Sequence, residues 1–182
     1  WAEGTDLAAD QSIDNVIEGF TDVLAEDMAI SADTLARNGM TGGTTVNYAS
    51  TAGSRGGVAT GMILTAAELL LARRTLRINN ARGIPEAGNK LAVIFSAETE
   101  NDWLRDPTYA YALANAGVRG DGNPIFEGYL PPYWGMAFFP TTNARVFITS
   151  GAGNVNVACT MVLGKGFYGI TELAAQQAQM IF

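Results

Sequence analysis

Apolar residues recur at helical spacing along the N-terminal part of the chain and predict one long amphipathic helix, from Ser12 to Asn38. Ser12 suits the N-cap, and Gly39 suits the left-handed position that ends many helices. Acids dominate the N-terminal part and Arg37 lies near the end, which complements the helix dipole. The apolar stripe consists of Ile13, Val16, Ile17, Phe20, Leu24, Met28 and Leu35.

The next segment, from Thr41 to Thr60, is rich in Gly, Ser and Thr. It predicts an irregular connection with one short strand at Thr44 to Tyr48. The series Thr65-Ala66-Ala67-Glu68 then fits a capping box and predicts a second helix that runs to about Asn80. Pro85 disfavours helical geometry in the residue before it and closes this region.

The almost wholly apolar run from Lys90 to Ser96 predicts a strand that is covered on both faces. Two short helices are expected after it, Ala97 to Arg105 and Pro107 to Ala116, with Gly117 as the stop. Short strands bounded by Gly, Pro or Asn follow, and Pro140 should lie at an edge or corner because it cannot donate to a ladder. The expected strands are Ile125 to Leu130, Gly135 to Phe139, Arg145 to Ser150, Asn156 to Leu163 and Phe167 to Ile170. Helices followed by strands, without regular alternation, favour an α+β fold.

Composition narrows the function classes. The net charge of −7 argues against tight nucleic-acid binding by the chain as a whole, because such binding requires clustered Lys and Arg. Histidine is absent, which removes Ser-His-Asp and Cys-His catalytic devices and His-ligated metals. Cys159 is the only cysteine, so no intrachain disulfide can form, and its apolar surroundings indicate a small buried side chain. No apolar stretch approaches the ~20 residues of a membrane span.

Two motifs could carry chemistry. Gly164 to Gly169 matches a dinucleotide fingerprint in its letters, but that site needs a helix opening after the glycines. Here the following residues favour a strand, so a glycine-rich strand junction is the preferred interpretation. Glu98, Glu100 and Asp102 could form a metal site, although carboxylates in a first helical turn are favoured by the helix dipole alone. We therefore expect no catalytic residue, no metal site and no cofactor.

Charge is distributed unevenly along the chain. All charged residues before Arg37 are acidic. The second predicted helix and the loop after it, in contrast, carry the one concentrated basic patch. A solvated helix face and an interface between copies both account for this patch. Opposite charges on identical subunits suit head-to-tail contacts, which close into rings or extend into lattices. The interface candidates are Arg73, Arg74, Arg77 and Arg82 on the basic side and Asp22, Glu26 and Asp27 on the acidic side.

The order of segments from Met62 to Leu173 resembles the outer lobe of tailed-bacteriophage major capsid proteins with the Hong Kong 97-like fold. It contains a helix, a strand that ends in a polar residue, and a helix with the pair Asp102-Trp103. A strand with the sequence pattern typical of this family follows, from Trp134 to Thr142. Two further segments resemble the branch typified by the capsid protein of the N-four coliphage. They are Arg77-Ile78-Asn79-Asn80-Ala81-Arg82 and Leu163-Gly164-Lys165-Gly166-Phe167-Tyr168-Gly169-Ile170.

The resemblance implies a structural protein, not an enzyme, that assembles into hexamers and pentamers of an icosahedral shell around double-stranded DNA. It implies an axial lobe at 62–150 and a peripheral lobe at 1–61 and 151–182, built on the long spine helix 12–38. Copies of the chain are the expected partners, and an auxiliary or cement protein is a further possible partner. The expected location is the virion, after assembly in the host cytoplasm. Neither membrane binding nor sequence-specific DNA binding is expected. No extended arm or long hairpin loop precedes the helix, so either those parts lie outside this chain or the lattice is clamped differently. An encapsulin-like compartment and a small α+β nucleotide-binding enzyme using Gly164 to Gly169 are the alternatives.

Overall fold

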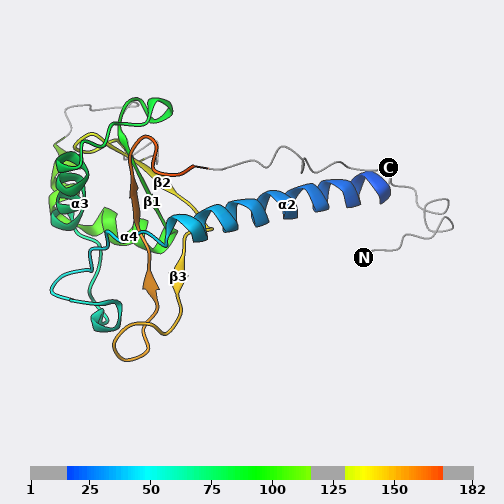
Figure 1. Ribbon diagram of the computed structural model, residues 1–182. Helices are drawn as coiled ribbons and strands as arrows, with labels where there is room; N and C mark the ends of the chain where they lie inside the picture. The colour runs from blue at the N-terminus through cyan, green and yellow to red at the C-terminus, as the bar shows by residue number, and fades with distance from the viewer. Residues whose placement is uncertain (1–15, 116–129, 170–182) are drawn as a thin grey trace. The chain divides into compact units, whose positions relative to one another are not determined.

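The computed structural model describes residues 16–115 and 130–169. The chain divides into two compact units, Trp1–Gly42 and Gly43–Phe182, and each is described by itself. The predicted N-cap Ser12, the stop at Gly117 and all but the last residue of the strand Ile125 to Leu130 lie outside the described residues. Element labels are those of Figure 1.

The first unit contains one long helix, α2, from Val16 to Met40 (Figure 1). The predicted stop at Gly39 is wrong: the helix continues through this residue to Met40, and Gly39 does not adopt a positive φ. A glycine can end a helix only if the next residues leave the helical path, and here Thr41 still donates to the Arg37 carbonyl at 3.0 Å. The apolar stripe is exposed along α2, with Leu24 at 62% and Met28 at 66%.

The second unit is built on a three-stranded sheet of order β2-β1-β5. Strand β1 (Leu91–Phe95) lies at its centre, pairs in parallel with β2 (Met136–Pro140), and pairs antiparallel with β5 (Met161–Leu163). The prediction of a strand covered on both faces is confirmed, because four of its five residues are buried. Pro140 ends the edge strand β2, where the missing N–H costs no ladder bond.

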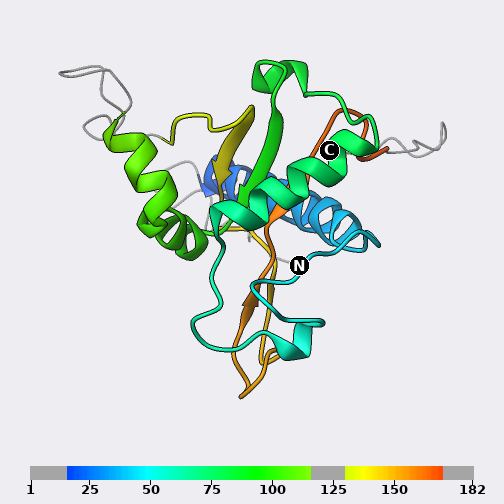
Figure 2. The ribbon, with the colours of Figure 1, turned by 90° about the vertical axis from the view of Figure 1, so that its left-hand side faces the viewer.

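Three helices accompany this sheet: α3 (Ala66–Ile78), α4 (Ala97–Arg105) and α5 (Pro107–Ala114). Helix α3 lies across one face of the sheet in both ribbon views (Figures 1 and 2). The predicted bounds of α4 are confirmed to the residue, and Ser96 caps it by accepting from the Thr99 N–H at 3.3 Å. Helix and strand are thus mixed without regular alternation, and the predicted α+β class is confirmed.

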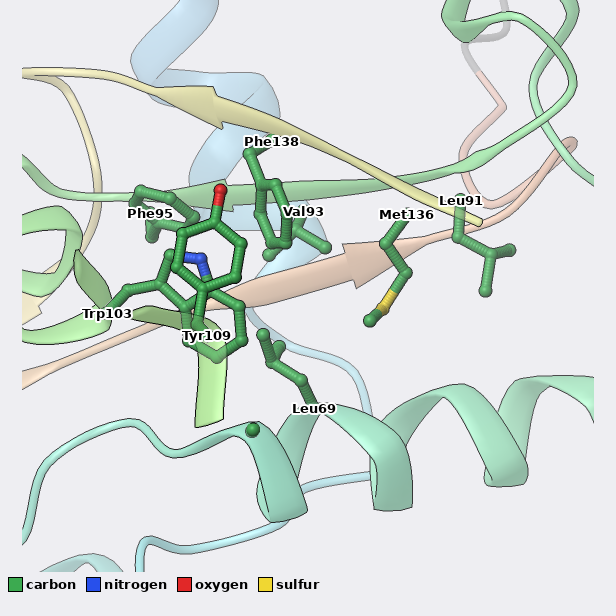
Figure 3. Close-up of a cluster of buried hydrophobic side chains, with 9 residues drawn as sticks. Leu69, Leu91, Val93, Phe95, Trp103, Tyr109, Met136 and Phe138 are labelled. Carbon is green, nitrogen blue, oxygen red and sulfur yellow. The ribbon is translucent and has the colours of Figure 1, made fainter. Parts of the chain in front are cut away.

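The core lies between the sheet and the three helices. Leu69 of α3 points toward Val93 of β1 and Met136 of β2, while Trp103 and Tyr109 close the cluster from α4 and α5 (Figure 3). The Trp103 and Tyr109 rings stack with centroids 4.6 Å apart, and Tyr109 is 1% exposed. Burial raises the pKa of the Tyr109 hydroxyl to about 12. Aromatic stacking in a dry cluster fixes the α4–α5 corner on the sheet.

Several predicted strands differ from the structure. The strand at Thr44 to Tyr48 does not form; this segment is irregular and leads to a short 3-10 helix, η1 (Arg55–Gly57). The predicted strand Asn156 to Leu163 is divided into β4 (Val157–Ala158) and β5, which belong to different sheets. The strand Arg145 to Ser150 shrinks to β3 (Val146–Phe147), which pairs with β4 as a two-stranded ribbon. Residues 167–169 form no strand.

Candidate assembly surfaces

Helix α3 positions three of the four predicted basic residues. Arg74 and Arg77 are exposed, and Arg73 is half-buried with a guanidinium Nε that finds no hydrogen-bond partner in the described chain. Arg82 lies exposed on the loop after the helix. None of the four side chains forms an ion pair or a hydrogen bond within the described residues. Their charges are therefore not neutralised inside the described part of the subunit.

The start of α3 is tied to its surroundings by two carboxylates. Glu68 accepts from the Thr65 N–H at 2.8 Å, which is the Glu half of the predicted capping box, and also from the Ser50 N–H of the preceding loop. Asp106 is 6% exposed and accepts from the Ala66 N–H at 3.2 Å through one oxygen. Its other oxygen caps α5 by accepting from the Tyr109 N–H at 3.1 Å. A buried carboxylate between two helix N-termini is favoured by both dipoles and holds α3 and α5 in place.

The end of α3 brings Arg82 back toward Arg77. Asn80 takes a left-handed φ of 56°, its N–H bonds the Arg77 carbonyl at 3.1 Å, and the Ala81 N–H bonds the Leu76 carbonyl at 2.9 Å. This pair of bonds is a Schellman motif, which satisfies the last carbonyls of the helix. The chain then reverses and places Arg82 beside the final turn of α3.

Two of the four arginines line a common depression, and the other two do not. The depression lies where the end of α3 meets the loop before β1 and the turn before β2, and no carboxylate of the described residues lines it. The loop is held in shape by close backbone packing: a Cβ added at Gly83 would lie 2.0 Å from the Asn89 carbonyl oxygen. The lining residues are Arg77, Ala81, Arg82, Gly83, Asn89, Leu91 and Gly135.

The turn at one side of this depression carries strain. Trp134 adopts a φ of 49° and Gly135 a φ of 73°, and Tyr133 and Met136 exchange both backbone hydrogen bonds across them. Two positive φ values in a two-residue turn are typical of type I′, where glycine is favoured and a tryptophan is rare. The Trp134 ring packs on Tyr133 with centroids 4.1 Å apart, which offsets part of this strain.

The acidic candidates lie on α2. Asp22, Glu26 and Asp27 are exposed and form no ion pair in the described part of the chain. Asp22 and Glu26 are four residues apart, so their side chains lie on the same face of the helix. The acidic candidates belong to the first unit and the basic candidates to the second, and each unit is described by itself.

The structure reveals a further basic cluster that the sequence did not suggest. Arg55 of η1 stacks on the Phe147 ring of β3 with its guanidinium carbon 3.5 Å from the ring centre, and Arg145 lies 5.2 Å from the same centre. Arg55 and Phe147 are far apart in sequence, so no local signal could have paired them. The Ala152 N–H bonds the Val58 carbonyl at 2.8 Å, which joins the same loop and ribbon (Figure 2).

Cys159 lies at the break between β4 and β5 and is half-buried. Burial raises the pKa of its thiol, although Arg55 and Arg145 act in the opposite direction. A raised pKa keeps the sulfur in its weakly nucleophilic thiol form at neutral pH. This environment agrees with the expected packing role better than with a reactive cysteine.

The remaining motifs lack the geometry of their proposed sites in the described residues. Gly164 to Gly169 follows β5, but no helix opens within these residues, and Gly164 instead allows close packing, since its Cβ would lie 3.0 Å from the Arg82 carbonyl oxygen. No group of three acidic, His or Cys side chains suitable for a metal occurs in the described ranges. Glu98 is exposed at the start of α4, as expected of a solvated first turn. Among the helices described, none is long and apolar enough to cross a membrane.

Comparison with known proteins rests on structure. No protein-family model and no curated protein sequence matches the chain. A solved structure described as the capsid of Ralstonia phage GP4 is similar, with a TM-score of 0.66 and 16% sequence identity over 89% of this chain. The chain therefore shares the fold of this capsid structure over the matched part. This chain spans 55% of the length of the GP4 chain, so what the longer protein does comes to this one only as a proposal.

Proposed function

We propose that this chain is a subunit of a tailed-bacteriophage shell: a major capsid protein with the Hong Kong 97-like fold, of the branch typified by the N-four coliphage capsid protein. The similarity to the GP4 capsid over 89% of the chain carries the proposal. The order of segments from Met62 to Leu173, noted in the sequence, supports it independently of the coordinates. The protein acts by assembly and not by catalysis, and it resides in the virion after assembly in the host cytoplasm.

In this proposal the chain has an axial lobe at 62–150 and a peripheral lobe at 1–61 and 151–182, with α2 as the spine helix. Copies of the chain form hexamers and pentamers that close into an icosahedral shell around double-stranded DNA. An auxiliary or cement protein is a further partner that the proposal admits. The shell encloses the DNA without sequence-specific binding, since the chain is acidic as a whole and its described basic residues form small clusters.

Opposite charges on the surface give these copies a way to associate. The basic residues of α3 and its loop meet the acidic residues of α2 on a neighbouring copy, and unpaired charges of both signs among the described residues support this contact. Charge reversal of Arg73 and Arg77 to Glu is expected to impair particle formation while the subunit still unfolds cooperatively at its usual temperature.

The proposal is tested by the association state of the purified protein. Sedimentation velocity and electron microscopy over increasing protein concentration should reveal capsomers or closed particles. A protein that remains strictly monomeric at the highest soluble concentration would contradict the shell. Particles filled with a cargo enzyme instead of DNA would favour the encapsulin-like alternative.

A further inference from the structure

The depression at the end of α3 contains two positive charges and no negative one among its lining residues. Arg77 and Arg82 both line it, together with Asn89 and the glycines of two turns. The last carbonyls of α3 already accept backbone N–H groups through the Schellman motif, so neither guanidinium is needed to satisfy them. Two like charges that share one hollow disfavour each other unless an anion joins them.

The chemistry of the hollow selects a carboxylate. A guanidinium presents a planar fork of N–H donors that matches a carboxylate with two parallel hydrogen bonds. An amide side chain such as that of Asn89 adds a donor without adding charge. The surrounding loop is rigid, because the Ile84 N–H bonds the Lys90 carbonyl at 2.9 Å and Gly83 admits no side chain. A pre-formed site of this kind loses little conformational entropy when it binds.

We propose that this depression binds a carboxylate from the Asp22–Glu26 face of α2 on a second copy of the chain. The inference rests on the proposed shell function and deepens it by naming the contact. Asp22 and Glu26 are exposed, unpaired in the described residues and one helical turn apart, with Cβ atoms about 5–6 Å apart. Two carboxylates at this spacing can address both arginines at once.

A phosphate of the enclosed DNA is a weaker occupant. Two arginines neutralise at most two phosphates, and such a contact contributes little to affinity at physiological salt. Helix α2 of a neighbouring copy, in contrast, supplies several carboxylates. Every subunit carries both α2 and the depression, so in an assembly the two are present at the same high local concentration.

The test is a charge swap in the complete protein. Arg77→Glu with Arg82→Glu is expected to raise the concentration at which particles form by more than about tenfold, because like charges then face each other at the contact. The matched control is Arg105→Glu with Lys165→Glu, which changes the net charge equally at two exposed basic residues outside the depression and outside the predicted interface. This control should shift the same concentration by less than about threefold, since charges in contact with solvent are screened by water and salt.

Adding Asp22→Arg and Glu26→Arg to the Arg77/Arg82 variant should restore assembly, with the melting temperature of the subunit unchanged throughout. An equal loss in the control, or no restoration by the swap, would overturn the contact. Normal particles that retain less DNA would overturn it in favour of a phosphate. If the unaltered protein fails to assemble, the shell proposal itself falls; if it assembles and the Arg77/Arg82 variant does so equally well, only the contact falls.

Discussion

Helix α2 and the segment 91–114 use similar apolar residues with opposite results. In the segment, the side chains of Val93, Phe95 and Trp103 are completely buried. Along α2, Leu24 and Met28 remain 62% and 66% exposed. The segment folds back as a strand and two short helices, so its apolar groups meet each other and the sheet. A single helix does not fold back on itself, so its apolar stripe can be buried only by another surface.

In the proposed shell, this difference separates residues that stabilise the subunit from residues that are available to contact other copies. Burial of the aromatic cluster stabilises the second unit, because about 25 cal/mol is gained for each Å² of apolar surface removed from water. The stripe on α2 is largely exposed, so in the proposed shell its apolar surface is available for a contact between copies. Substitutions in the two regions should therefore affect different measurements.

A large effect on folding is expected where one buried carboxylate holds two helices. Asp106→Ala removes the acceptor for the N–H groups of Ala66, Thr108 and Tyr109 and leaves them without this partner in a site that is largely closed to water. We expect the free energy of unfolding to fall by about 2–4 kcal/mol, measured by urea denaturation.

Two control variants make this prediction specific. Asp102→Ala, the same change on α4 at a half-buried residue without a described side-chain hydrogen bond, should cost less than about 1 kcal/mol. Asp106→Asn keeps a single carbonyl oxygen and should fall between the two. Equal losses for Asp102→Ala and Asp106→Ala would mean that the link between α3 and α5 contributes nothing of its own.

A smaller, pH-dependent effect on the stability of the fold comes from Tyr109 in the buried aromatic cluster. Burial raises the pKa of Tyr109 from 10.0 to about 12, so the folded state favours the neutral phenol. This contribution is fully present below pH 10 and is lost as the pH rises from about 10 to about 12, because the unfolded chain ionises first. The free energy of unfolding should fall by roughly 1–3 kcal/mol over this interval, because a tenfold change in an ionisation constant corresponds to about 1.4 kcal/mol.

The measurement is the melting temperature between about pH 8 and pH 12, which spans the ionisation of the phenol in both states. Tyr109→Phe should flatten the alkaline decline, although it also removes a weak 3.5 Å hydrogen bond to the Pro131 carbonyl. Tyr111→Phe serves as the control, because Tyr111 is 74% exposed and should leave the decline unchanged. An identical decline in both variants would assign the alkaline loss to other groups.

The sequence specified the fold well where local signals were complete. The helix Ala97 to Arg105 has the predicted bounds, because a serine cap and the Asp106-Pro107 start leave little choice. The strand predicted at Lys90 to Ser96 forms and is one residue shorter at each end. Prediction failed at Asn156 to Leu163, a continuous stretch that the structure divides between two sheets. That division depends on which partner strand each half meets, and the partner of β5, strand β1, is distant in sequence.

For the candidate assembly surface, the sequence predicted which basic residues take part but not how they are arranged. The sequence identified a basic patch, but it could not separate Arg77 and Arg82, which share a depression, from Arg73 and Arg74, which do not. This separation arises from the chain reversal at Asn80 and from packing of the loop against distant strands. The stacking of Arg55 on Phe147 was missed for the same reason.

The smallest effect on folding, and the clearest break between the two regions, is expected on α2. Leu24→Ala should change the free energy of unfolding by less than about 0.5 kcal/mol, because the side chain is already largely in contact with water. The same substitution at Leu69, which is 1% exposed, should cost about 2–5 kcal/mol through lost burial and a residual cavity. Particle formation should respond in the reverse order: Leu24→Ala weakens it in protein that is still fully folded, whereas Leu69→Ala weakens it only in proportion to the unfolded fraction. If Leu24→Ala destabilises the isolated subunit as strongly as Leu69→Ala does, the stripe belongs to the core of the subunit and not to a contact between copies.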